Sequence, residues 1–265
     1  MPTHSLPVSS SAIATKLRAA GCVFAEAEAR LLVAAAGTAA ELDAMVDHRV
    51  DGLPLEQVLG WAEFCGLRIA IEPGVFVPRR RTEFLVREAA ALAPPRAVIL
   101  DMCCGSGAVG AALAASLDQV ELYAADLDPA AVKCARQNLP AASVFEGDLF
   151  EPLPTSLRGR VDILVANAPY VPSDEIRLMP SEARLHEPRM ALDGGGDGLD
   201  IQRQVAAEAL QWLAPGGHLL IETSERQAPQ TVNVFERSGL EAWVRRDHEV
   251  SATVVIGRRR GAQSD

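Results

Sequence analysis

The sequence has no long run of apolar residues and no excess of basic charge. No stretch approaches the roughly 20 apolar residues that a membrane span needs, and Met1 to Ser11 lack a basic segment followed by an apolar core. We therefore expect a cytoplasmic protein with no membrane contact. The formal net charge is −10. Because phosphate neutralisation requires a broad basic surface, this charge disfavours DNA or RNA as the main partner.

Patterns typical of disulfide frameworks and metal sites are also missing. The five cysteines form no Cys-x-x-Cys pair and are odd in number, which fits a reducing compartment. The histidines form no cluster with ligand spacing. Aspartates flank the glycines at 194–196, but their spacing does not match a calcium loop. We therefore predict no metal site.

The length of 265 residues suits one sizeable α/β domain with a small appendage. From Ser11 to about Val50 apolar residues recur at spacings of three and four, which predicts two or three packed helices, and we assign residues 1–52 to a helical domain. Alternating apolar residues then precede the turn at Pro73-Gly74, which predicts a β-hairpin over about Phe64 to Val77. We assign residues 53–81 to this hairpin linker, 82–260 to the main domain and 261–265 to a tail.

Strands and helices alternate in the main domain, which Thr82 opens as a plausible helix N-cap. The predicted strands are 97–102, 121–125, 143–146, 161–166, 218–223, 242–246 and 253–257. The predicted helices between and after them are 107–116, 129–138, 199–213 and 228–238. This order is typical of an α/β fold with a doubly wound, mostly parallel sheet covered on both faces.

A glycine-rich turn follows the first strand of this sheet. The strand ends at Asp101, and Gly105, Gly107 and Gly110 follow. Glycines at this place let a ligand approach the backbone N–H groups at the start of the next helix. Together with Asp126 about 20 residues later, they match the dinucleotide fingerprint, in which the acidic residue binds ribose hydroxyls. This pattern alone leaves the cofactor ambiguous.

Two further carboxylates favour S-adenosylmethionine over a dinucleotide. Asp101 precedes the glycines, where it would repel a pyrophosphate but attract the cationic methionine part of S-adenosylmethionine. Asp148 follows the third strand at the same edge of the sheet, where it can accept a hydrogen bond from an adenine amino group. The residues that we expect to bind the cofactor are Asp101, Cys103, Cys104, Gly105, Ser106, Gly107, Asp126, Leu127, Asp148, Leu149 and Asn167.

The fourth strand runs into Asn167-Ala168-Pro169-Tyr170, again at the carboxyl edge where doubly wound sheets place ligands. The side-chain oxygen of Asn167 and the backbone carbonyl of Ala168 can each accept one N–H of a planar NH2 group, and the Tyr170 ring can cover its face. Such a site works by orienting a weakly nucleophilic nitrogen, without a side-chain nucleophile. We predict a methyl acceptor with a planar nitrogen.

In these residues the chain resembles the HemK-type protein-glutamine methyltransferases, which modify the glutamine of the Gly-Gly-Gln loop in peptide-chain release factors. The resemblance runs from about Leu53 to Arg258 and adds ordered matches outside the two motifs. They include Pro73 to Arg79, Thr82-Glu83, Gly147 to Phe150, Glu187-Pro188-Arg189, Asp197-Gly198-Leu199 and Leu213 to Gly217. The resemblance implies a seven-stranded class I methyltransferase domain, catalytic residues at Asn167, Ala168, Pro169 and Tyr170, substrate binding by the same four residues and Arg79, and a helical domain that docks a protein substrate.

The sequence departs from the family pattern at several positions. Ala168 replaces the first proline of Asn-Pro-Pro-Tyr, and Cys103 replaces a glycine in the cofactor turn. Arg80 and Arg81 replace a proline and an acidic residue, and the helical region is short. These departures indicate a divergent member. Two alternatives stay open: a methyltransferase for an exocyclic base amine or a small molecule, and a non-catalytic nucleotide-binding domain.

Overall fold

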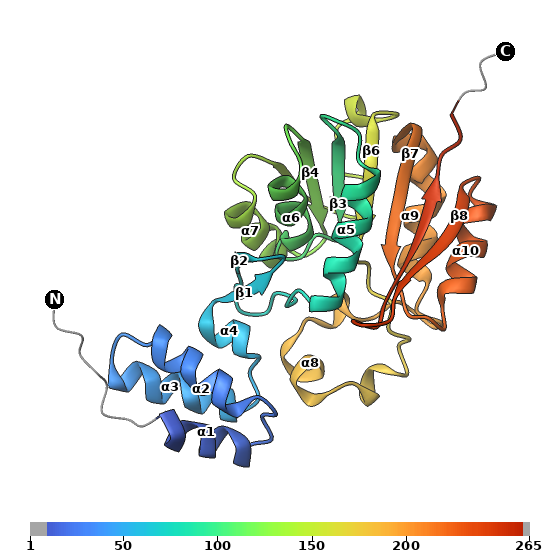
Figure 1. Cartoon of the computed structure of the whole chain (residues 1–265). Coiled ribbons are helices and arrows are strands. Elements are labelled where there is room, and N and C mark those ends of the chain that lie inside the picture. Colours follow the sequence, from blue (N-terminus) through green and yellow to red (C-terminus); the bar gives the residue numbers. More distant parts are fainter. Residues whose placement is uncertain (1–9, 262–265) are drawn as a thin grey trace.

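A helical bundle stands at the amino-terminal end of residues 10–261, the part of the chain that the computed structural model describes (Figure 1). Its helices are α1 (Ser10–Ala19), α2 (Ala25–Ala35) and α3 (Ala39–Val50), and the short α4 (Leu55–Leu59) follows. The helices bury one apolar face each, around Leu17, Leu32 and Leu42. Thr38 caps α3, where its hydroxyl oxygen accepts a hydrogen bond from the backbone N–H of Glu41 at 3.1 Å. The assigned residues 1–9 and 262–265 lie outside the described part.

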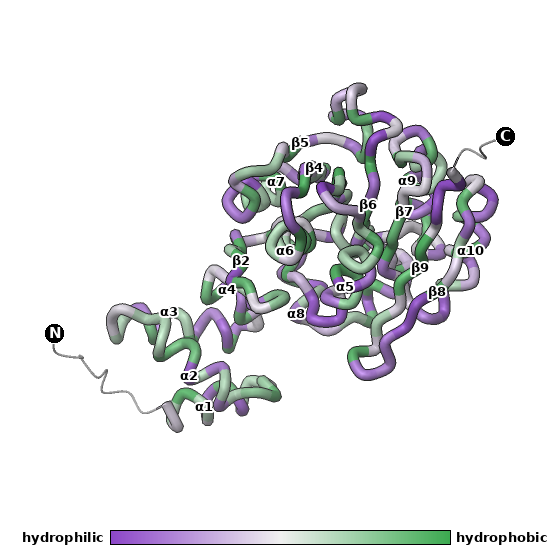
Figure 2. The backbone as a smooth tube through the Cα atoms, turned by 45° about the horizontal axis from the view of Figure 1, so that its top comes forward, coloured by the Kyte–Doolittle hydropathy of each residue, from purple (hydrophilic) through white to green (hydrophobic). Residues whose placement is uncertain are grey.

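A two-stranded hairpin joins this bundle to the main domain (Figure 2). It pairs β1 (Trp61–Phe64) with β2 (Leu67–Ala70), so its turn is Cys65-Gly66. The predicted hairpin over Phe64 to Val77 was therefore wrong in its register. Both turn residues have positive φ, 50° and 74°, as a two-residue hairpin turn of the primed type requires. Cysteine is rare in such turns, and Pro73-Gly74 gave a stronger but misplaced signal.

The main domain contains a seven-stranded sheet, as predicted. Its strands are β3 (Val98–Met102), β4 (Glu121–Asp126), β5 (Ser143–Glu146), β6 (Val161–Ala166), β7 (Leu213–Glu222), β8 (Glu241–Asp247) and β9 (Ala252–Arg258). Their order is β5-β4-β3-β6-β7-β9-β8, and β9 runs against its two neighbours. From β3 the chain order runs outward to β4 and β5 on one side, and it continues with β6 and β7 on the other side of β3. Doubly wound sheets bind ligands at this reversal of strand order.

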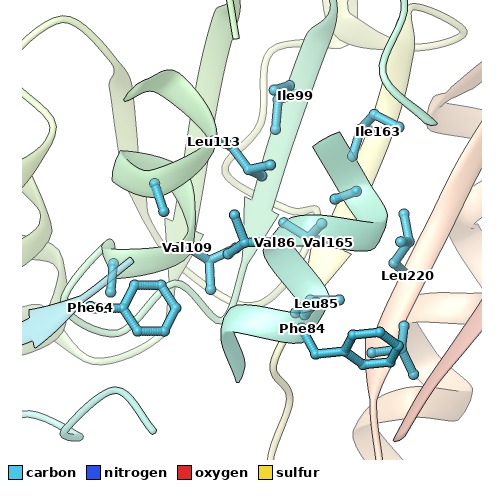
Figure 3. Packing of buried hydrophobic residues seen from close by; sticks show 14 of the residues in the cluster. Phe64, Phe84, Leu85, Val86, Ile99, Val109, Leu113, Ile163, Val165 and Leu220 are labelled. Carbon is cyan, nitrogen blue, oxygen red and sulfur yellow. The ribbon is translucent and has the colours of Figure 1, made fainter. Parts of the chain in front are cut away.

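Helices cover both faces of this sheet. They are α5 (Glu83–Leu92), α6 (Ala108–Ser116), α7 (Pro129–Asn138), α9 (Asp200–Trp212) and α10 (Ala228–Arg237). Figure 3 shows α5 and α6 on one face, where Val86 and Leu113 pack against Ile99. On the other face α9 and α10 pack against Leu100 and its neighbours. No helix within residues 10–261 has the length and apolarity to cross a bilayer.

Strand alternation fixes the face on which the functional side chains emerge. In β6, Ile163 and Val165 belong to the layer under α5 and α6, whereas Leu164 and Ala166 belong to the layer under α9 and α10. Side chains on a strand alternate between faces, so Asn167, the next residue, continues on the α5 side. The sequence of a buried strand thus determines the direction of the first polar residue after it.

The long connection between β6 and α9 lies between the bundle and the main domain (Figure 1). It contains η3 (Ile176–Leu178), α8 (Ser181–His186) and η4 (Arg189–Ala191), none of which the sequence predicted. Arg49 of α3 forms an ion pair with Glu182 of α8 at 3.6 Å, and the Gln57 side chain donates to the His186 carbonyl at 3.5 Å. These contacts tie the bundle to the connection that follows the Asn167 segment.

Candidate active site

A cleft opens at the carboxyl edge of β3, β4, β5 and β6, with about 1030 Å³ of empty space including the solvent at its mouth. Most residues that the sequence assigned to the site line this cleft. They are Asp101, Cys103, Cys104, Gly105, Ser106, Asp126, Leu127, Asp148, Leu149, Asn167 and Pro169. Gly107, Ala168, Tyr170 and Arg79 do not line it.

The lining of the cleft is acidic. It contains four aspartates, at 101, 126, 128 and 148, and no lysine or arginine among the described residues. The carboxylates at 126, 128 and 148 would repel a dianionic pyrophosphate, whereas a cationic ligand would be attracted and would favour the ionised form of Asp101. The dinucleotide alternative therefore does not fit the charge of this cleft.

The turn after β3 has the backbone conformation that a close ligand approach needs. Gly105 has φ of 55°, and a Cβ built there would meet no atom within 4 Å, so the position faces open space. At Gly107, by contrast, a Cβ would lie 2.9 Å from Leu139 of the α7 end. Cys103 also has a positive φ, 56°, which strains a non-glycine residue and explains why the family has glycine there.

Asp126 of β4 holds this turn, and Asp101 of β3 holds the first turns of α6, which follows it. The backbone N–H of Gly105 donates to Oδ2 of Asp126 at 2.8 Å, and the N–H of Asp128 donates to Oδ1 at 2.9 Å. Asp101 accepts a hydrogen bond from the N–H of Gly110 at 2.8 Å. Burial raises the pKa of Asp126 and raises that of Asp101 to about 8. Both carboxyl groups are thus fixed in place before any ligand binds.

The remaining predicted cofactor residues form the outer part of the cleft. Leu127 is 53% exposed although it is apolar, and Leu149 follows Asp148 with φ of 44°. An apolar side chain left in solvent beside a cleft can pack against a flat ligand ring. The end of β5 thus offers both an acceptor and an apolar contact at the same edge.

Two hydrogen-bond acceptors of the Asn167 segment have no protein partner. Nδ2 of Asn167 donates to Oγ1 of Thr82 at 3.5 Å. Within residues 10–261, neither Oδ1 of Asn167 nor the carbonyl oxygen of Ala168 accepts a hydrogen bond. The Ala168 side chain is buried, so alanine replaces proline without altering the cleft surface.

Tyr170 belongs to a polar network beside the cleft that joins the exposed Arg81 to the buried Glu222. Nη2 of Arg81 donates to its hydroxyl oxygen at 2.7 Å, and the hydroxyl donates to Oε1 of Glu222 at 3.1 Å. Nε of Arg81 donates to the same Oε1 at 3.1 Å. Burial and the Glu222 carboxylate raise the pKa of Tyr170 far above its usual range, which keeps the hydroxyl protonated.

Arg79 lies outside the cleft and is occupied elsewhere. Its guanidinium forms an ion pair with Glu187 at 2.6 Å and lies over the Phe76 ring at 4.9 Å. Glu187 also accepts a hydrogen bond from the N–H of Val77 at 3.4 Å. Arg79 therefore clamps the end of the linker to the β6–α9 connection, and its role in substrate binding stays a prediction.

Two residues of the site were missed or misread in the sequence. Glu222 is the last residue of β7 and Asp101 is the last but one of β3, so an acidic residue near the carboxyl end of a buried strand is a pattern that could have revealed it. Thr82 was predicted to cap α5, but its hydroxyl makes no cap hydrogen bond. Because the 3-10 turn η1 (Arg80–Thr82) precedes α5, Thr82 already has helical φ and ψ, and its hydroxyl is directed to Asn167 instead.

The comparisons first define the class of protein. The family model described as methyltransferase small domain matches residues 66–200. The crystal structure of a methyltransferase from Pyrococcus furiosus aligns with a TM-score of 0.57 at 16% identity, over 74% of this chain and 90% of that one. Fold and site thus define a class I methyltransferase, a class that implies S-adenosylmethionine as methyl donor. Among the described residues, no cluster of three His, Cys, Asp or Glu side chains could hold a metal ion.

Relatives of similar length then give the family. The release factor glutamine methyltransferase of Geobacter sulfurreducens is 38% identical, over 81% of this chain and 76% of its own. That of Gloeobacter violaceus is 36% identical, over 77% of this chain and 74% of its own. The chain belongs to the release factor glutamine methyltransferase family, as the resemblance of its motifs implied.

Proposed function

We propose that this chain methylates the side-chain amide nitrogen of a glutamine in a protein, and that this protein is a release factor, as the names of its relatives indicate. The observation that carries the proposal is the pair of unpartnered acceptors at Asn167 and Ala168, next to an acidic cleft. A primary amide carries two N–H donors in one plane, which this pair can accept.

The cleft residues fit S-adenosylmethionine, which supplies an electrophilic methyl group when bound. We assign the ribose hydroxyls to Asp126, the adenine to Asp148, Leu127 and Leu149, and the methionine part to Asp101 and the turn at 103–107. The oriented carboxylates and the lack of any cation in the described lining support this assignment.

The protein residues act on the acceptor by orientation. An amide nitrogen is a poor nucleophile because its lone pair is delocalised into the carbonyl. Asn167 and Ala168 would hold the amide through its two N–H groups, and Tyr170 would lie along its face, so that the nitrogen is directed at the donor. No side chain of this site need form a covalent intermediate.

We assign the docking of the protein substrate to the helical domain together with the β6–α9 connection. Val23 and Phe24, in the turn between α1 and α2, are 84% and 72% exposed, and Leu185 of α8 is 65% exposed. Exposed large apolar side chains are typical of surfaces that bind another protein. The net charge of −10 and the acidic cleft argue against a nucleic-acid substrate.

One labelling experiment tests this proposal. The purified chain is incubated with methyl-labelled S-adenosylmethionine and a full-length release factor, or with the same factor carrying Gln→Ala in its Gly-Gly-Gln loop. We expect label in the unchanged factor and none in the variant. Label in both proteins would place the acceptor elsewhere, and label found only in added RNA or DNA would overturn the substrate class.

A further inference from the structure

A buried carboxylate connects the linker to the segment Asn167-Ala168-Pro169-Tyr170, which we call the acceptor motif. Glu222 is 2% exposed, and its Oε1 accepts two hydrogen bonds, from Arg81 and from Tyr170. Its Oε2 is buried without a partner among the described residues. Burying a carboxylate with an unsatisfied oxygen costs free energy unless a cation compensates it. Arg81 is the cation that pairs with Glu222, at 3.1 Å.

The fold brings these residues together from separate elements. Ala166 of β6 pairs in register with Ile221 of β7, so Asn167, which follows β6, lies beside Glu222, the last residue of β7. Both continue on the α5 side, where η1 begins that helix. From η1, Thr82 contacts Asn167 and Arg81 contacts Tyr170, so one short segment contacts both polar residues of the motif.

We propose that Arg81 and Glu222 are positioning residues that hold the Tyr170 hydroxyl from two sides and thereby fix its ring across the face of the acceptor amide. The inference rests on the proposed function, because the amide defines what the ring must cover. Neither residue lines the cleft, so both act through Tyr170.

The geometry explains why two partners are needed. A phenol with one hydrogen bond can still swing about that contact, whereas partners on η1 and on β7 determine where its oxygen lies. Arg81 also lies over the Tyr170 ring, 6.0 Å from its centroid. Because a displacement of about 1 Å can cost about 100-fold in rate, the ring position matters as much as its presence.

A double-mutant cycle with Tyr170→Phe tests whether the two residues act through the hydroxyl. We expect Arg81→Gln and Glu222→Gln each to lower kcat about 10- to 100-fold, with S-adenosylmethionine affinity changed less than about twofold. In the Tyr170→Phe background, either change should add little, because the hydroxyl is already gone. If kcat in a double variant falls by the full product of the two single-variant factors, the inference is overturned.

Two further variants guard against a trivial loss of folding. Arg81→Gln with Glu222→Gln removes both charges together, so the buried Glu222 is not left as an unpaired charge, and the double variant should be more stable than Arg81→Gln alone. Arg80→Gln is the matched control. Arg80 is exposed and its side chain makes no hydrogen bond or ion pair within residues 10–261, so Arg80→Gln should leave kcat unchanged.

A readout without substrate separates this inference from the proposed function. The chain has two tyrosines, Tyr123 and Tyr170, so ring-labelled tyrosine gives two NMR signals, which Tyr170→Phe assigns. The Tyr170 signal should shift or broaden in Arg81→Gln and Glu222→Gln but not in Arg80→Gln. An unchanged signal overturns the inference even if the enzyme methylates release factors. A changed signal supports the positioning of the Tyr170 ring by Arg81 and Glu222, even if release factors prove not to be substrates.

Discussion

Asn167, which follows β6, lies beside Glu222, the last residue of β7, because Ala166 and Ile221, which precede them, are partners in the β6–β7 register. The acceptor motif is therefore held by an adjacent strand and by η1, apart from the carboxylates that line the cofactor part of the cleft. Changes in the two groups should have separable effects on binding and on turnover.

Asn167→Ala should lower kcat by a factor of about 10² to 10³, the usual cost of removing one positioned polar group from a preorganised site. The affinity for S-adenosylmethionine should stay nearly the same, because Asn167 makes no hydrogen bond to Asp101 or Asp126 within residues 10–261. Calorimetry and methyl-transfer rates measure the two quantities. Full turnover in this variant would mean that Asn167 is only a turn residue.

Asp126→Ala should weaken S-adenosylmethionine binding about 10- to 100-fold, since hydrogen bonds to a charged group contribute about 1.5–3 kcal/mol. The change also frees the N–H of Gly105, which loosens the turn. Glu146→Ala is the control, because Glu146 pairs with Asp126 in the β4–β5 register but lies outside the cleft. Equal affinities in calorimetry for the two variants would contradict the ribose assignment.

The sequence predicted most of the sheet and the cofactor turn because these depend on local patterns. β5, β6 and α7 begin and end at the predicted residues, and the apolar run of β6 and Pro129 at the start of α7 are signals of this local kind. The strand pattern also placed the Asn167 to Tyr170 segment at the carboxyl edge of the sheet, where Asn167 and Pro169 line the cleft.

The missed features depend on contacts between distant segments. Glu222 becomes part of the site only through β6–β7 pairing and through Arg81, 141 residues earlier. The α8 helix has six residues, too few to show a helical period, and it is supported by Arg49 and Gln57 from the bundle side. Such contacts leave no periodic trace in the sequence.

The pKa of Asp101 predicts a pH dependence of stability. Burial raises this pKa to about 8 in the folded protein, against about 3.9 in the unfolded chain. Between these values the folded state holds a proton that the unfolded state has lost, so the contribution of Asp101 is full below about pH 4 and is lost as the pH rises to 8. Asp101→Asn should remove this loss.

Denaturant unfolding at several pH values checks this expectation. The variant should be more stable than the wild type at pH 8 and nearly equal at pH 4, with a slope difference of at most about 1.4 kcal/mol per pH unit in between. Asp118→Asn, at an exposed position, is the control for a change of net charge. Parallel curves for Asp101→Asn and wild type would contradict a buried protonated carboxyl.

Asn138 should connect the hairpin to the cofactor turn. Its side chain donates to the carbonyls of Ala70 and Ser106, at 2.9 and 2.8 Å, and accepts from the N–H of Ala70 at 2.9 Å. Asn138→Ala should therefore weaken S-adenosylmethionine binding about tenfold, equivalent to about one hydrogen bond. Cys134→Ala removes thiol contacts to the Ala70 carbonyl and to Nδ2 of Asn138 but leaves the bond from Asn138 to Ser106, so it should leave that affinity unchanged. Equal calorimetric affinities in both variants would contradict the connection.

Cys103 offers a test of backbone strain in the cofactor turn. With φ of 56° it adopts a conformation that costs a non-glycine residue about 1–2 kcal/mol. Cys103→Gly should therefore be about 1 kcal/mol more stable than Cys103→Ala. At most positions the order is reversed, because glycine gives the unfolded chain more conformational entropy than alanine does. Cys134 lies inside α7 and provides the matched pair of variants. There the Ala variant should be about 1 kcal/mol more stable than the Gly variant. Urea unfolding of the four variants measures both differences. If alanine is the more stable residue at both positions, the left-handed conformation at Cys103 carries no strain, and the family's glycine there must serve ligand approach alone.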